Sequence, residues 1–138
     1  MQVALINTNR MQPPVAPIAL DYLAEALHAA GHTVRLLDLC WEDDPGPAVA
    51  RFFRGSPAGL VGMTLRNTDD CAFTSGQSFL PDFVELVRLV REHCDAPIVA
   101  GGVGFSVMPE LVLEISGADY GVWGEGEFVL PEFAARLV

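Results

Sequence analysis

The feature that most constrains the fold is a regular alternation between short apolar runs and helical patterns. The runs are rich in Val, Ile and Leu without a polar residue at every second position, as in strands covered on both faces. They occupy residues 3–6, 33–39, 59–64, 98–100 and 120–123. Strands that return through a helix lie parallel, with a right-handed crossover. The alternation therefore predicts an α/β protein with five parallel strands.

The segments between the runs carry the expected helices. Residues 81–93 form the clearest one, with an apolar face at Phe83, Leu86, Val87 and Val90. Further helices are predicted at residues 17–30, 48–54 and 109–116 and from residue 127 onwards, with Pro131 in or just after the first turn of the last. We expect one domain over residues 1–138: a doubly wound, flavodoxin-like (Rossmann-like) parallel sheet of strand order 2-1-3-4-5.

Charge and composition exclude several classes of partner. The chain has 18 acidic and 8 basic residues, a net charge of −10, and no basic cluster for a phosphate backbone, so we expect no nucleic acid partner. No apolar run reaches the roughly 20 residues of a membrane span, so we expect no membrane partner. The 3 cysteines, Cys40, Cys71 and Cys94, are too few and too scattered for a disulfide framework, which favours a cytoplasmic location.

The carboxyl ends of four predicted strands meet at one edge, where open α/β sheets bind ligands. This edge is rich in glycine, amide and hydroxyl groups and poor in general bases. Its residues are Asn7, Thr8, Asn9 and Arg10 after the first strand, Thr64, Leu65, Arg66 and Asn67 after the third, Gly101, Gly102, Val103 and Gly104 after the fourth, and Trp123, Gly124, Glu125 and Gly126 after the fifth. Backbone N–H groups of glycine-rich turns bind phosphate or amide oxygens, so the edge suits a large polar cofactor better than acid–base chemistry.

Other chemistries lack their motifs. There is no His-Glu-x-x-His, Cys-x-x-Cys or Walker A pattern, and the glycines at 101–104 do not have dinucleotide-binding spacing. A receiver domain would need carboxylates where Asn7 and Thr64 stand. The histidines, His28, His32 and His93, fall near predicted helix ends away from the edge, which favours surface or helix-end residues.

Two charged residues at the edge are candidates for function. Arg66 directly follows a strand, although an ion pair with Asp69 or Asp70 explains it equally well. Glu125 stands between glycines at another strand end, although an acidic residue at a helix start is a fair alternative.

Five segments in order resemble a known family. They are Leu-Ile-Asn-Thr at 5–8, Pro-Ile-Ala-Leu-Asp-Tyr-Leu-Ala-Glu-Ala-Leu-His-Ala-Ala-Gly-His-Thr-Val at 17–34, Leu-Val-Gly-Met-Thr at 60–64, Pro-Ile-Val-Ala-Gly-Gly-Val-Gly at 97–104, and Ala-Asp-Tyr-Gly-Val-Trp-Gly-Glu-Gly-Glu at 118–127. This set resembles the cobalamin (B12)-binding domain that precedes the catalytic barrel in B12-dependent radical SAM methyltransferases. The resemblance covers nearly the whole chain.

The resemblance implies a corrin ring over the carboxyl edge and a nucleotide tail threaded beside the strands. By position, Gly101, Gly102 and Gly104 would line the tail, and the other edge residues would surround it. The Asp-x-His-x-x-Gly motif of the methionine synthase type is missing, so the resemblance implies cobalt held without a protein histidine. No residue is expected to ligate the metal. Arg66 is placed near the lower face of cobalt as a cation that cannot ligate.

The resemblance also implies a division of labour. S-adenosylmethionine and a 4Fe-4S cluster would belong to a radical SAM catalytic domain, and the Cys-x-x-x-Cys-x-x-Cys cluster motif does not occur here. We therefore expect this chain to bind methylcobalamin without catalysing alone. It would serve a larger enzyme that relays a methyl group from S-adenosylmethionine to a small-molecule or peptide natural-product precursor. The alternatives are a flavodoxin-like domain binding flavin or nucleotide, and a regulatory interaction domain.

Overall fold

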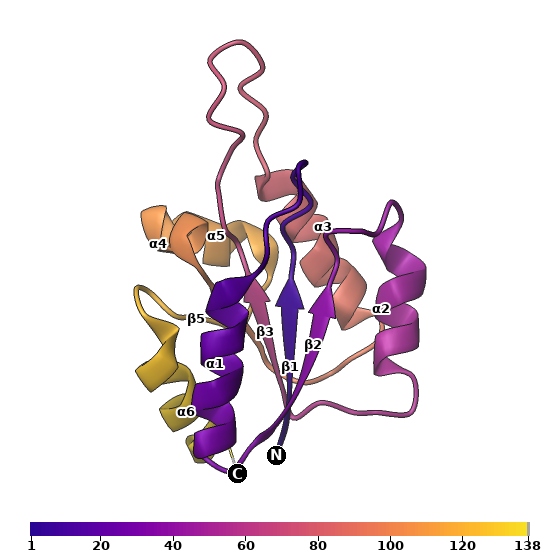
Figure 1. Ribbon diagram of the computed structural model, residues 1–138, viewed down its shortest axis with the longest axis vertical. Helices are drawn as coiled ribbons and strands as arrows, with labels where there is room; N and C mark the ends of the chain where they lie inside the picture. The colour runs from indigo at the N-terminus through magenta and orange to yellow at the C-terminus, as the bar shows by residue number, and fades with distance from the viewer. Residues whose placement is uncertain (138) are drawn as a thin grey trace.

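A five-stranded, all-parallel sheet of order β2-β1-β3-β4-β5 forms the centre of the computed structural model, which describes residues 1–137 (Figure 1). This confirms the predicted fold class and strand order. The strands are β1 (Gln2–Asn7), β2 (Thr33–Asp38), β3 (Leu60–Thr64), β4 (Ile98–Gly101) and β5 (Tyr120–Gly121). The helices are α1 (Ile18–Ala29), α2 (Pro45–Phe53), α3 (Leu80–Arg91), α4 (Val103–Val107), α5 (Pro109–Ser116) and α6 (Gly126–Arg136).

Two apolar cores lie on opposite faces of the sheet, because successive side chains of each strand point to opposite sides. On one face, Ala4 and Ile6 of β1 belong to the core that α2, α3, α4 and α5 cover. On the other face, Val3 and Leu5 belong to the core under α1 and α6, which pack against each other. The second face also holds the candidate site described below.

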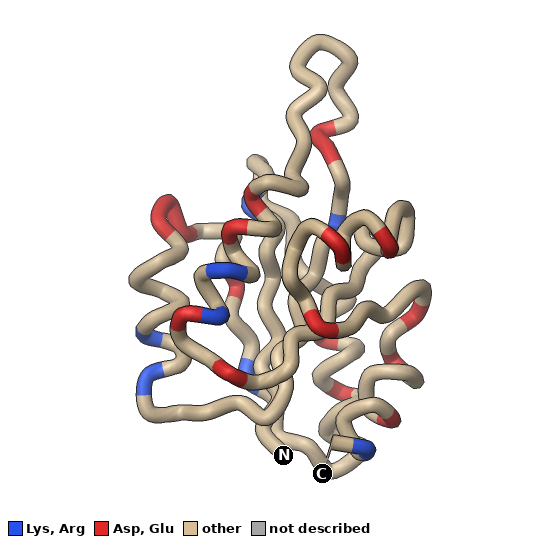
Figure 2. The backbone as a smooth tube through the Cα atoms, turned by 180° about the vertical axis from the view of Figure 1, so that it is seen from behind, with Lys and Arg blue, Asp and Glu red and all other residues tan. Residues whose placement is uncertain are grey.

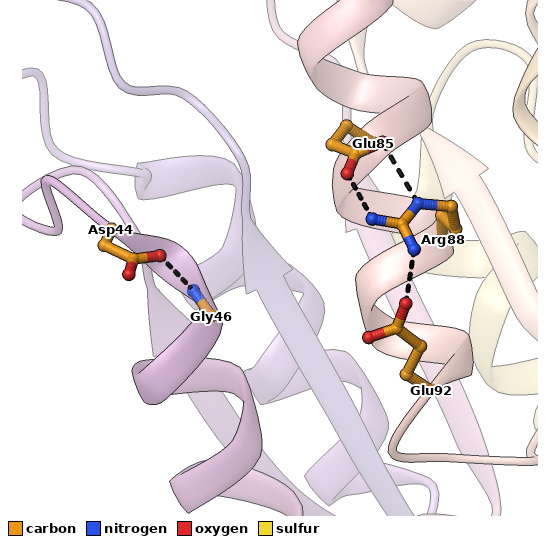
Figure 3. A network of polar contacts seen from close by, with 5 residues as sticks. All are labelled: Asp44, Gly46, Glu85, Arg88 and Glu92. Carbon is orange, nitrogen blue, oxygen red and sulfur yellow. Dashed lines mark hydrogen bonds and ion pairs between the residues drawn. The ribbon is translucent and has the colours of Figure 1, made fainter.

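Helix α2 begins three residues before the predicted start. The Asp44 carboxylate accepts a hydrogen bond of 3.0 Å from the backbone N–H of Gly46, and Pro45 occupies the first turn (Figure 3). A side-chain cap followed by proline is a favoured helix start. On the neighbouring α3, Arg88 pairs with Glu85 and Glu92 on the exposed face, and the hydrogen bond from Arg88 lowers the pKa of the Glu85 carboxyl (Figure 3).

Two other elements differ from the prediction. Helix α4 was not predicted, since its five residues are too short for a helical period. Strand β5 has two residues instead of four: the N–H of Val122 still donates to Ala100 at 2.9 Å, but the chain then turns, with Gly124 at a φ of +82°. Pro131 is the sixth residue of α6, just after the first turn, as predicted, and it is buried.

The segment between β3 and α3 is an arm that extends past the carboxyl ends of the strands (Figure 1). An isolated antiparallel bridge joins Asp69 to Ser78, and the N–H of Asp70 donates to the Gln77 carbonyl at 3.0 Å. At its far end, the Phe73 side chain is fully exposed. The long irregular segment predicted after the third strand is therefore a structured arm.

Charge is spread over the molecule. Acidic residues lie on elements on both sides of the sheet, and the basic residues do not merge into one patch (Figure 2). In residues 1–137, no helix is long and apolar enough to cross a membrane.

Candidate functional site

A cavity of about 670 Å³ opens at the carboxyl edge of the sheet and extends inwards between the sheet and helices α1 and α6. Its floor consists of two rows of residues that run across β1, β3 and β4. The strand register aligns Leu5 with Gly62 and Gly62 with Val99 in the inner row. It aligns Asn7 with Thr64 and Thr64 with Gly101 in the outer row. We call this cavity the slot.

The inner row is apolar and closely packed. Leu5 and Val99 are 0% and 3% exposed, and Gly62 between them is buried. A Cβ atom at Gly62 would lie 2.8 Å from Cδ2 of Leu5, so only glycine keeps this part of the floor open. Leu23 and Leu130 line the slot from α1 and α6.

The outer row is polar and tied to its surroundings. The Asn7 amide donates to the Asp38 carboxylate at 2.8 Å, and its oxygen accepts from the N–H of Asn9 at 3.2 Å. The Thr8 hydroxyl donates to the Thr64 carbonyl, which joins the ends of β1 and β3. These bonds hold the two loops in place at the mouth of the slot.

The glycines at the end of β4 and just after it serve two purposes: the first is to line the slot, and the second is to allow a close approach between two loops. Gly101 and Gly102 line the slot, whereas Gly104 is buried outside it. Gly102 has a φ of +100°, and a Cβ there would lie 2.7 Å from the Leu65 carbonyl oxygen. A Cβ at Gly104 would lie 2.9 Å from the same oxygen. The second purpose is therefore to let the turn after β4 approach the backbone at 65–67, where the Gly104 N–H donates to the Arg66 carbonyl at 2.9 Å.

A second hollow of about 470 Å³ lies between the loop after β1 and the base of the arm. Thr8, Leu65 and Asn67 line this hollow and not the slot, whereas Arg66 lines both. Arg66 is exposed, and within residues 1–137 its side chain forms no ion pair. The alternative explanation, a pair with Asp69 or Asp70, is therefore wrong.

The loop after β5 completes the mouth. Gly124, Glu125 and Gly126 line the slot, whereas Trp123 does not and is 76% exposed. The Ser106 hydroxyl of α4 accepts from the Gly124 N–H at 3.0 Å and donates to the Gly102 carbonyl at 3.0 Å, which ties two loops together. Val103 also lines the slot and is 75% exposed.

The histidines lie at the other end of the molecule. His28 lies in the last turn of α1 and His93 follows α3, and both are exposed. His32 lies just after the end of α1 and is buried: its Nδ1 lies 3.3 Å from the amino terminus, at the start of β1. Helix ends and strand starts share the amino edge in a βαβ unit, so none of the three faces the slot.

Sequence reasoning missed the apolar half of the site. Gly62 carried a usable signal, because an isolated glycine inside a strand indicates a close approach. Ser106 carried none, because a lone serine is an ordinary surface residue, and the aliphatic residues of α1 and α6 carried none, because such residues usually belong to a core.

The profile of the B12 binding domain family matches residues 5–134, which is most of the chain. This chain belongs to the B12-binding domain family. It is 42% identical over 136 residues to tryptophan 2-C-methyltransferase of Streptomyces laurentii, and the match covers 98% of this chain and 23% of that protein. The chain thus spans about a quarter of that relative's length.

Solved structures share the fold of this chain. The radical S-adenosylmethionine methyltransferase TsrM from Kitasatospora setae, solved with cobalamin and a [4Fe-4S] cluster, is 40% identical with a TM-score of 0.96, over 99% of this chain and 24% of that one. The cobalamin-dependent radical enzyme OxsB, at 17% identity and a TM-score of 0.74, shares the fold over 99% of this chain and 18% of its own. A response regulator from Clostridium difficile, at 13% identity and a TM-score of 0.58, also shares the fold.

Proposed function

We propose that residues 1–138 form the single cobalamin-binding domain of a radical SAM methyltransferase. The nucleotide tail would enter the slot, and the corrin would lie over the carboxyl edge between the slot and the second hollow. The observation that carries this proposal is the shape and lining of the slot. It has an aliphatic inner part that glycine keeps open and a mouth of amide, hydroxyl and glycine backbone groups.

The residues present fit such a cofactor. A cavity of about 670 Å³ lies within the usual range for small-molecule sites, roughly 300–1,000 Å³. Amide side chains such as Asn9 suit the amide substituents of a corrin. A flavin or nucleotide domain is the second candidate, and the shared doubly wound fold is the only observation that favours it.

We further propose that the cobalt is held without a protein histidine, since all three histidines lie at the amino edge. The bound cofactor supplies a cobalt centre that can accept and donate a methyl group. Arg66 would keep the lower side free of a protein ligand, because a guanidinium stays protonated and offers no lone pair. Its exposed, unpaired position between the two cavities supports this role.

The rest of the enzyme would carry the chemistry. Relatives about four times longer support a companion radical SAM domain that holds S-adenosylmethionine and a 4Fe-4S cluster. The identity of 42% to a tryptophan methyltransferase supports a small-molecule acceptor, and we propose tryptophan or a related indole.

Cofactor retention tests the binding function. The purified chain is incubated with hydroxocobalamin, desalted, and examined by visible spectroscopy, with FMN in a parallel sample. We expect corrinoid to be retained with a base-off spectrum. Retention of FMN alone would support the flavin alternative, and retention of neither would refute both.

The role of Arg66 is tested by Arg66→Ala, with Arg54→Ala as a control at the opposite end of the sheet. We expect Arg66→Ala to change the spectrum of the bound corrinoid, because water can then reach the lower face, and to slow methyl transfer in the full-length enzyme. Arg54→Ala should leave both unchanged. An unchanged spectrum and rate for Arg66→Ala would show that Arg66 has no such role.

A further inference from the structure

We propose that the inner part of the slot selects corrinoids by the base at the end of their nucleotide tail, favouring dimethylbenzimidazole over adenine. This inference rests on the proposed function, since it requires that the tail enters the slot. It adds a specificity that the family assignment does not contain: which cobamide this chain takes.

The first observation is the lining of the inner part. Leu5, Leu20, Val99 and Leu130 are each at most 4% exposed. They contribute only hydrocarbon groups, from two strands and both covering helices. Such a surface gains free energy by covering an apolar ring.

The second observation is where the polar groups of the slot lie. Among residues 1–137, the polar side chains that line it belong to the outer row or to the loops and helix ends at the mouth: Asn7, Asn9, Thr64, Arg66, Ser106, Glu125 and Glu127. The nearest amide, that of Asn7, already donates to Asp38 and accepts from Asn9. The inner-row residues belong to β1, β3 and β4, and each of these strands is paired with a neighbour on both sides. A polar group at the inner end therefore finds no free partner.

The two tail bases differ in the polar groups that they would place at the inner end of the slot. Adenine carries an exocyclic amine and additional ring nitrogens, whereas dimethylbenzimidazole presents methyl groups on a carbocyclic edge. Burying an unpaired donor or acceptor is costly, whereas burying a methyl group is favourable. We expect a preference for dimethylbenzimidazole of about tenfold or more in Kd.

The test compares three corrinoids on the same 138-residue chain by isothermal titration calorimetry: cobalamin, the adenine-containing cobamide, and cobinamide, which lacks the tail base. We expect cobalamin to bind about tenfold tighter than the adenine cobamide, and cobinamide to bind more weakly than cobalamin. Because this comparison uses the unaltered chain, it does not depend on the folding of any variant.

A pair of isosteric variants locates the selectivity. Val99→Thr places a hydroxyl in the inner row, and Val3→Thr makes the same change on the same face, at a buried position outside the slot. We expect Val99→Thr to narrow the ratio of the two Kd values severalfold. Val3→Thr should keep the ratio of the unaltered chain.

The outcomes separate this inference from the proposed function. Equal affinity for the two cobamides, or cobinamide binding as tightly as cobalamin, would overturn the selectivity while leaving corrinoid binding intact. A ratio that moves as much in Val3→Thr as in Val99→Thr would also overturn it. If none of the three corrinoids binds, the proposed function itself is wrong.

Discussion

Replacing Gly62 with alanine should weaken cobalamin binding while leaving the free chain about as stable as before. Gly62 sits in the middle of the inner row, and the new Cβ would lie 2.8 Å from Cδ2 of Leu5. Carbon atoms in contact normally stand about 3.5–4.0 Å apart, so the Leu5 methyl must move by roughly 1 Å. The slot beside it provides the space.

The effect on stability comes from two opposing contributions. Removing a glycine from a strand interior stabilises by roughly 0.5–1 kcal/mol, because the unfolded chain loses freedom. Turning Leu5 away from its preferred rotamer costs about 0.5–1.5 kcal/mol. The free energy of unfolding should therefore stay within about 1 kcal/mol of the original value.

No opposing contribution of this kind offsets the effect of Gly62→Ala on the affinity for cobalamin. The new methyl group and the displaced Leu5 methyl group both take space that the tail would fill. At about 0.8 kcal/mol for each buried methyl-sized contact, the loss is near 1.6 kcal/mol, roughly a tenfold increase in Kd.

Calorimetry measures the Kd directly, and thermal unfolding with cobalamin checks it. At a ligand concentration about 100 times the original Kd, the unaltered chain should gain roughly 2.7 kcal/mol and the variant roughly 1.4 kcal/mol. Gly59→Ala is the matched control: its Cβ would lie 3.2 Å from the flexible Sδ of Met1 and 3.6 Å from the Gln2 carbonyl oxygen, outside the slot. Equal Kd values for the two variants would refute the placement of the tail.

Two further predictions concern stability. Gly102→Ala should lower the free energy of unfolding in urea by at least about 2 kcal/mol, because Gly102 has a φ of +100° and the new Cβ would lie 2.7 Å from the Leu65 carbonyl oxygen. The control Gly55→Ala, at a φ of +69° in open space, should lower it by about 1 kcal/mol. Equal losses for the two variants would contradict the close approach at Gly102. Burial raises the pKa of the Asp119 carboxyl, but hydrogen bonds from the Ile98 N–H and an α3 guanidinium outweigh it, so the pKa lies below its ordinary 3.8. This stabilisation is present above pH 3.8 and is lost as the pH falls through the lower folded pKa. Because the Asp119 side chain is 40% exposed, solvent weakens these bonds, and Asp119→Asn should lower the free energy of unfolding by less than about 1 kcal/mol at pH 7 and by a smaller amount at pH 3. A loss that is the same at both pH values would contradict this assignment.

The arrangement of the site explains how one edge can hold a bulky cofactor without bases for acid–base chemistry. The outer row and the loops use their polar groups to fix one another, as Thr8 fixes Thr64 and Ser106 joins two turns. Arg66 remains free because the backbone around it is held by Gly104 instead of by its own side chain. A preformed mouth of this kind costs little to order when a ligand binds.

Local pattern by itself determined the strands, most of the helices, the strand order and the residues at the carboxyl edge. Each of these follows from short-range periodicity and from the handedness of crossovers. It also placed all three histidines away from that edge, because each lies near the end of a predicted helix.

The tertiary structure alone decided what lies between the elements. The slot exists because Leu5, Gly62 and Val99, far apart in the chain, fall in one register beneath α1 and α6. Likewise, the glycines at 102 and 104 serve the approach of another loop as much as they serve a ligand. Such features depend on contacts across strands and layers, and no local period encodes the distance between two packed elements.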